Sequence, residues 1–164
     1  DGETSGASKQ NAGTLCIRAE NEGLDSELHL TINGGIIDIV SGNDGINTNE
    51  DGVSVTTING GELDIQVTGE TGEGDGIDSN GWLVINSGTV VAQACSFSGD
   101  AGIDSDMGIH INGGTVIASG NMLDRISESN QTYAVLNFNK FTNSSLLDFV
   151  RILLHFCGRS AFSW

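Results

Sequence analysis

An aspartate or asparagine follows glycine by two positions in a motif that occurs four times. The motif reads Gly23-Leu24-Asp25-Ser26, Gly45-Ile46-Asn47-Thr48, Gly76-Ile77-Asp78-Ser79 and Gly102-Ile103-Asp104-Ser105. Side chains of an extended chain alternate between two faces, so the apolar residue and the Ser or Thr face one way and the Asp or Asn faces the other. Outward oxygen ligands repeated in this way are donors of the kind that Ca²⁺ takes from proteins.

Nine polar residues in or beside these motifs are the candidate metal ligands. They are Glu22, Asp25, Asp44, Asn47, Asp75, Asp78, Asp100, Asp104 and Asp106. Carboxylates stacked at a strand spacing of about 5 Å repel each other by about 3 kcal/mol per pair at an effective dielectric constant of about 20. A hard cation removes this repulsion, and a set of Asp, Asn and Glu fits Ca²⁺ better than Zn²⁺ or Cu²⁺. The alternative is a solvated acidic face that keeps an edge-rich protein soluble.

Two residues near these motifs are candidates for carbohydrate binding. Trp82 is the only tryptophan within the repeats and comes just after the Asp78 motif, and His110 faces outward by alternation in Ile109-His110-Ile111. An aromatic ring next to an acidic corner is a suitable platform for a sugar. Each residue also has a plainer interpretation, because Trp82 can simply stack on its strand and a lone outward histidine is commonly a surface residue. The sequence indicates no catalytic residue.

A longer repeat must position all of these side chains. Asn-Gly-Gly, or its variant Asn-Ser-Gly, begins at Asn33, Asn59, Asn86 and Asn112, with spacings of 26, 27 and 26 residues. Segments with period-two alternation flank each turn, which is typical of strands. Stacking the repeats produces an asparagine column, whose amides can hydrogen-bond along the stack, and three aliphatic columns. The aliphatic columns are Ile32, Ile58, Ile85 and Ile111; Ile37, Leu63, Val90 and Val116; and Leu24, Ile46, Ile77 and Ile103.

Three strand segments and about 26 residues per coil predict an all-β fold, a parallel β-helix (a solenoid) of about four to five coils. A β-propeller or a sandwich is the alternative, but propeller blades need about 40 residues each. The chain of 164 residues has 24 glycines, no proline and a formal net charge of −16. That charge argues against nucleic acid and anionic lipid as partners. No run of 18 apolar residues is present, so the sequence predicts no membrane insertion.

The composition changes sharply near residue 140. Residues 1–139 are acidic and rich in glycine, whereas residues 140–164 are basic and aromatic, and we predict the first range as the β-helix and the second as an unrelated tail. Apolar residues at helical spacing within 146–157 indicate a short amphipathic helix, and disorder is the alternative. The tail is either a cap over the open end of the β-helix or a sequence foreign to the repeat.

The segments Glu73–Gly81 and Gly99–Asp106, together with the Asn-Gly-Gly turns, resemble a bacterial family of calcium-binding, acidic-sugar-binding β-helix proteins. This family is usually labelled "carbohydrate-binding domain-containing protein" and is distantly related in fold to pectate lyases. The resemblance covers roughly residues 12–138. It implies a right-handed parallel β-helix, an extracellular location, bound Ca²⁺, and binding of polygalacturonate-like polysaccharide without established cleavage. Members are generally longer, so this chain looks like a fragment. By position, the family's acidic corners match Asp44, Asp75, Asp78 and Asp104.

The expected function is therefore an extracellular or cell-surface, calcium-dependent module that binds an acidic polysaccharide of the pectin type without cleaving it. The start of this chain, Asp1-Gly2-Glu3-Thr4, has no signal-peptide character. Two other classes of function stay open. One is a polysaccharide lyase, which would need a basic residue near the calcium ion. The other is a calcium-stiffened structural or adhesin solenoid that binds no sugar.

Overall fold

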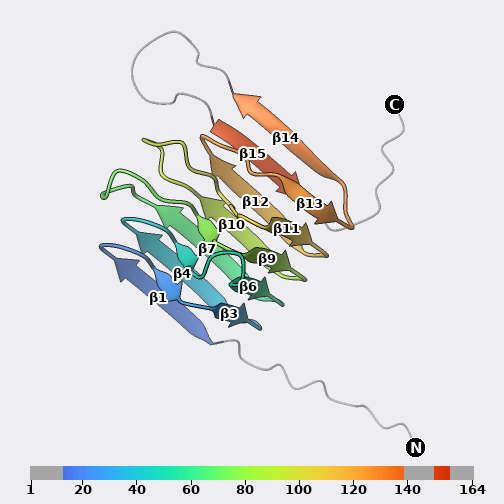
Figure 1. The fold of residues 1–164 in the computed structure, drawn as a ribbon, viewed down its shortest axis with the longest axis horizontal. Helices are drawn as coiled ribbons and strands as arrows, with labels where there is room; N and C mark the ends of the chain where they lie inside the picture. The colour runs from blue at the N-terminus through green and yellow to red at the C-terminus, as the bar shows by residue number, and fades with distance from the viewer. Residues whose placement is uncertain (1–12, 139–149, 156–164) are drawn as a thin grey trace, which may run out of the picture.

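The computed structural model describes residues 13–138 and 150–155, and every regular element in these two ranges is a β-strand. Three sheets run along the molecule, and nearly all of their strand pairs are parallel (Figure 1). The structure confirms the predicted all-β parallel β-helix, with about four turns. In the described ranges, no helix has the length and apolar character that crossing a membrane would require.

We name the sheets by their number of strands. The seven-stranded sheet has the order β1 (Thr14–Ala19), β4 (Ile36–Ser41), β7 (Glu62–Val67), β10 (Thr89–Gln93), β12 (Thr115–Gly120), β15 (Val150–His155) and β14 (Tyr133–Phe138). The five-stranded sheet has the order β13 (Ile126–Ser129), β11 (Gly108–Ile111), β9 (Trp82–Ile85), β6 (Val55–Ile58) and β3 (His29–Ile32). The three-stranded sheet consists of β2 (Leu24–Ser26), β5 (Ile46–Thr48) and β8 (Ile77–Ser79).

The three aliphatic columns that the repeat predicts lie in the core, where only Leu24 is partly exposed. Further apolar residues of the strands, such as Ile39, Ile65 and Leu83, are buried with them. Ile58 pairs with Ile32 of the preceding coil and with Ile85 of the following coil, and Ile58 and Ile85 are completely buried. The inward Ser and Thr of the repeated motif also bond along the stack, since the Thr48 hydroxyl donates to Ser79 Oγ at 2.7 Å. One coil cannot cover its own apolar residues, so burial between neighbouring coils holds the solenoid together.

Asparagine and glycine form the turns between the five-stranded and seven-stranded sheets. The glycine that ends each turn motif has a positive φ, which is 106° at Gly61 and 99° at Gly88. A Cβ atom at Gly88 would lie 2.7 Å from the carbonyl oxygen of Gly61, so the coils stack closely here only with glycine. Beside the glycines, the predicted asparagine column is confirmed: Asn86 Nδ2 donates to Asn59 Oδ1 at 2.7 Å, and Asn112 Nδ2 donates to Asn86 Oδ1 at 2.8 Å.

The last strand corrects one prediction for the tail. Val150–His155 forms β15, whereas the helical spacing of its apolar residues predicted a helix. The strand lies between β12 and β14 and pairs antiparallel with both (Figure 1), so its backbone groups find hydrogen-bond partners on two sides. Such pairing overrides a local helical pattern. The rest of the predicted helix, residues 146–149 and 156–157, lies outside the described residues.

Candidate metal and carbohydrate site

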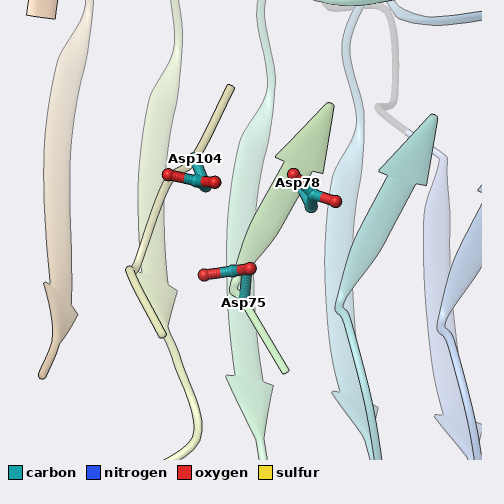
Figure 2. A group of neighbouring side chains, drawn as sticks. All are labelled: Asp75, Asp78 and Asp104. Carbon is teal, nitrogen blue, oxygen red and sulfur yellow. The ribbon is translucent and has the colours of Figure 1, made fainter. Parts of the chain in front are cut away.

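Three carboxylates from two neighbouring coils gather at one corner of the solenoid. Asp75 precedes β8, Asp78 is the middle residue of β8, and Asp104 occupies the equivalent position in the next coil (Figure 2). One oxygen atom of each carboxylate lies within 4.8 Å of the other two, and all three residues are half-buried. We call these three residues the Asp cluster.

Glycine allows the coils to approach each other at this corner. A Cβ atom at Gly76 would lie 2.4 Å from the carbonyl oxygen of Gly102, so no other residue fits there without a shift of the backbone. Backbone hydrogen bonds fix the contact, because Ile77 N–H donates to the Gly102 carbonyl at 3.1 Å and Asp104 N–H donates to the Ile77 carbonyl at 2.7 Å. The acidic residues next to these glycines are therefore held close to one another.

Burial and mutual repulsion oppose the ionisation of the Asp cluster. Burial raises the pKa of Asp75 to about 8, and the charges of Asp104 and Asp78 contribute to the shift. Burial likewise raises the pKa of Asp78 to about 7, with contributions from Asp44 and Asp104. The pKa of Asp104 rises to about 6, mainly through burial and then through the charge of Asp124. Without a cation, the Asp cluster thus retains protons near neutral pH, and a metal ion that binds there displaces them.

The donor atoms at this corner fit Ca²⁺. Among the residues that the structure describes, no basic side chain forms an ion pair with the Asp cluster. Asn47 lies next to Asp78 in the parallel register, and its side-chain oxygen is buried and accepts no hydrogen bond. Ca²⁺ takes 6–8 oxygen ligands from carboxylates, amide carbonyls and water in a flexible geometry. Asp75, Asp78 and Asp104 would hold such an ion, and the side-chain oxygen of Asn47 is an uncharged ligand atom on the neighbouring strand.

Two more of the predicted ligands support the loop that carries Asp75. Asp44 Oδ1 accepts a hydrogen bond from the Asp75 backbone N–H at 2.7 Å, and burial raises the pKa of Asp44 to about 6. Asp100 Oδ2 accepts from the Gly74 N–H at 2.8 Å and from the Ser98 hydroxyl. Both carboxylates therefore fix the backbone at the corner through hydrogen bonds.

The other four predicted ligands lie outside the Asp cluster. Glu22 Oε1 accepts from Asn47 Nδ2 at 3.3 Å, and Asp25 Oδ1 accepts from Asn49 Nδ2 at 2.8 Å. Asp106 is exposed, and its backbone N–H donates to the Ser79 carbonyl at 3.0 Å. A metal-binding role for these four residues stays a prediction.

The repeated motif does not predict one acidic residue that lies at the corner. Asp124 Oδ2 accepts a hydrogen bond from the Ser105 N–H at 3.2 Å, and its charge helps to raise the pKa of Asp104. Asp124 follows Asp104 by 20 residues, not by the 26 that separate Asp78 from Asp104, and it is not preceded by Gly-Ile. The motif therefore gives no signal for it.

The two predicted carbohydrate-binding residues meet on the outer face of the five-stranded sheet. The ring centroids of Trp82 and His110 are 5.2 Å apart, and the ring planes are tilted by 59°. His110 Nδ1 lies 3.2 Å from Glu128 Oε2, which comes from β13 in the next coil. Together with Val84 and Asn112, the two rings line a hollow of about 350 Å³.

The comparison with protein families agrees with the repeat and its fold. The model of a family described as "Carbohydrate-binding domain-containing protein" matches residues 6–125, which is 120 of the 164 residues. This range contains the Asp cluster, Trp82 and His110. No curated protein and no solved structure matches the chain. The name of the family indicates carbohydrate binding. Since the match covers well over half of the sequence, this β-helix belongs to the family of carbohydrate-binding domain-containing proteins.

Proposed function

We propose that this chain is a non-catalytic module that binds an acidic polysaccharide through Ca²⁺ held by the Asp cluster. The observation that carries the proposal is the convergence of three half-buried carboxylates within 4.8 Å, with no basic partner among the described residues. Family membership supplies the ligand class, because it indicates carbohydrate.

Charge explains why the carbohydrate would be acidic and why calcium would be required. The chain has a formal net charge of −16, so a bare polyuronate is repelled from it. A Ca²⁺ ion on Asp75, Asp78 and Asp104 would supply local positive charge, and its remaining coordination positions can accept a carboxylate from the sugar. We propose an extracellular or cell-surface location for the protein, because calcium modules outside the cell have affinities of about 10⁻⁴–10⁻³ M and act where calcium is abundant.

The contacts of His110 and Arg18 favour binding over lyase chemistry, and Arg125, which follows Asp124, forms no ion pair with the Asp cluster. A lyase removes a proton next to the uronate carboxylate, so it needs a base close to the metal. His110 is the imidazole nearest in the chain to the Asp104 motif, and it is engaged by Trp82 and Glu128 on the five-stranded sheet. Arg18 pairs with Asp38, which lies on the seven-stranded sheet.

Retention on immobilised polygalacturonate tests the proposal directly. The protein is applied with Ca²⁺ or with a chelator, and the variant Asp78→Asn is compared with Asp64→Asn, which changes an exposed acidic residue on β7. We expect retention only with Ca²⁺, loss of retention in Asp78→Asn, and normal retention in Asp64→Asn. The eluate should contain no new unsaturated sugar ends.

The opposite results separate the three classes of function. Equal retention with chelator would refute the calcium requirement, and unsaturated products would identify a lyase. If Ca²⁺ raises the melting temperature but the protein does not bind the polymer, the structural solenoid is correct. An unchanged melting temperature would refute calcium binding itself.

A further inference from the structure

We infer that the hollow formed by Trp82, Val84, His110 and Asn112 is a second carbohydrate subsite, which packs against the apolar C–H face of one pyranose ring and needs no calcium. The inference rests on the proposed function for the identity of the polysaccharide. The subsite lies on a different sheet from the Asp cluster, binds through packing and hydrogen bonds, and does not depend on metal.

The size and lining of the hollow suit the apolar face of a single sugar ring. Its volume of about 350 Å³ is near the lower end of the range for small-molecule sites, which is about 300–1,000 Å³. None of the four lining residues is acidic, although the chain as a whole is strongly acidic. The indole of Trp82 therefore offers a flat apolar surface on which the C–H groups of a pyranose ring can pack without repulsion.

Polar groups beside the indole have hydrogen-bonding capacity left for sugar hydroxyls. Glu128 engages Nδ1 of His110, which leaves Nε2 of the imidazole for a ligand. Asn112 uses one hydrogen of its amide nitrogen on Asn86 Oδ1 at 2.8 Å, and a side-chain amide has two such hydrogens. An apolar platform with a few polar groups beside it is the usual composition of a small-ligand site.

A glycine opposite the tryptophan shapes the hollow. Gly108 pairs with Trp82 in the parallel register of β9 and β11, and its φ is 144°. A Cβ atom at Gly108 would lie 3.3 Å from Trp82 Cζ3 and still closer to the Ser127 side chain. The absence of a side chain at this position lets the indole lie across the neighbouring coil and meet His110. Both β9 and β11 pair with a strand on each side, so the surface that carries Trp82 and His110 is rigid.

The hollow is near enough to the Asp cluster for one polysaccharide chain to contact both. Trp82 follows Asp78 by four residues, so their Cα atoms are at most about 14 Å apart. A chain of a few sugar rings covers such a distance. Two linked contacts bind more tightly than either alone, because the second contact forms at high effective concentration.

Tryptophan emission tests the inference. The substitution Trp164→Phe leaves Trp82 as the only tryptophan. The probe is a fully methyl-esterified trigalacturonide, which has no carboxylate for calcium to bind, and the titration is done in chelator. We expect a saturable change in emission, which Asp78→Asn retains. With Ca²⁺ present, Trp82→Ala and His110→Ala should each weaken binding of polygalacturonate by about 3- to 10-fold, whereas Leu28→Ala, a change at another exposed apolar residue, should not.

The subsite and the proposed function fail in different ways. If the uncharged trisaccharide leaves the emission of Trp82 unchanged, the subsite is refuted, even where calcium-dependent retention on polygalacturonate persists. Full polymer affinity in a folded Trp82→Ala variant would refute it as well. If emission responds while retention is independent of Ca²⁺, the subsite stands and the calcium part of the proposed function is refuted.

Discussion

Two polar columns run along this solenoid, and they satisfy their hydrogen bonds in opposite ways. In the asparagine column each amide donates to the amide of the preceding coil, at distances of 2.9, 2.7 and 2.8 Å from Asn59 to Asn112. A carboxylate can only accept, so the Asp cluster has no such internal solution. Its residues carry raised pKa values, and Asp75 Oδ1 accepts only a backbone hydrogen bond, from the Ala101 N–H at 2.5 Å.

With the same backbone repeat, the type of side chain alone decides whether a stacked column can satisfy its own hydrogen bonds. Both sets of residues lie beside stacked glycines. The turn asparagines recur once per coil, and so does the motif position that Asp78 and Asp104 share with Asp25 and Asn47. An amide carries donor and acceptor together, so its column is complete in itself. A column of carboxylates needs protons or a cation from outside, and this requirement makes it a candidate binding site.

The largest effect is expected when the Asp cluster is made to resemble the asparagine column. Asp78→Asn removes one of three charged ligands and should lower the affinity for Ca²⁺ by about 100-fold, which corresponds to about 2.7 kcal/mol. Without Ca²⁺ at pH 8, the same variant should melt at a higher temperature than the original protein, because a like-charge repulsion has been removed. Calorimetric titration and thermal melting measure the two effects.

The essential result is that Asp78→Asn raises the melting temperature without Ca²⁺ and lowers it with Ca²⁺. Asp64→Asn is the matched control, since Asp64 is exposed on β7, and its melting temperature should barely change in either condition. A variant Asp78→Asn that is destabilised with and without Ca²⁺ would show that Asp78 has a purely structural role.

The second effect is the pH dependence of the calcium-free protein. The pKa of Asp75 is about 8 in the folded state, against an ordinary value of 3.8, so the folded state keeps a proton that the unfolded state has released. The stability that this proton supplies is complete below pH 3.8 and is lost as the pH rises through 8. The melting temperature should therefore fall between pH 6 and 8, and the fall should be smaller in Asp75→Asn. A saturating concentration of Ca²⁺ should abolish the difference, and identical profiles without Ca²⁺ would contradict the assignment.

Most of the contacts within the columns could be predicted from the sequence, because strict repetition fixes which residues become neighbours in successive coils. The aliphatic columns and the bonded asparagines follow directly from the 26-residue period. The period could not select which acidic residues converge. Asp25 has the same motif as Asp78, but Asn49 satisfies it and Asn47 separates the two residues in the register.

Prediction failed where the period breaks. Asn130 Nδ2 donates to Asn112 Oδ1 at 3.5 Å and so extends the asparagine column, although it follows Asn112 by only 18 residues. The last coil is therefore short, and Asp124 reaches the corner from an unexpected position in the sequence. β15 joins the sheet through backbone pairing with β12 and β14, which its own helical spacing does not encode. Both features arise from contacts that have no counterpart in the repeat.

The smallest effect is expected when the asparagine column is made to resemble the Asp cluster. In Asn86→Asp, the new carboxylate still accepts from Asn112 Nδ2 but faces Asn59 Oδ1 without a donor. Since the column is exposed, the loss should be about 1 kcal/mol of unfolding free energy at pH 7. Denaturant unfolding measures it, and Asn86→Ala is the comparison variant.

The stability at low pH distinguishes Asn86→Asp from Asn86→Ala. Below its ordinary pKa of about 3.9 the new carboxyl group is protonated and can again donate to Asn59, so most of the loss in Asn86→Asp should be recovered near pH 3. Asn86→Ala has no group to protonate, and its loss should be the same at pH 3 and pH 7. Equal behaviour of the two variants would mean that the asparagines stabilise the turn through packing alone. Recovery only in Asn86→Asp would show that the donated hydrogen bond is what separates the self-sufficient column from the one that needs a cation.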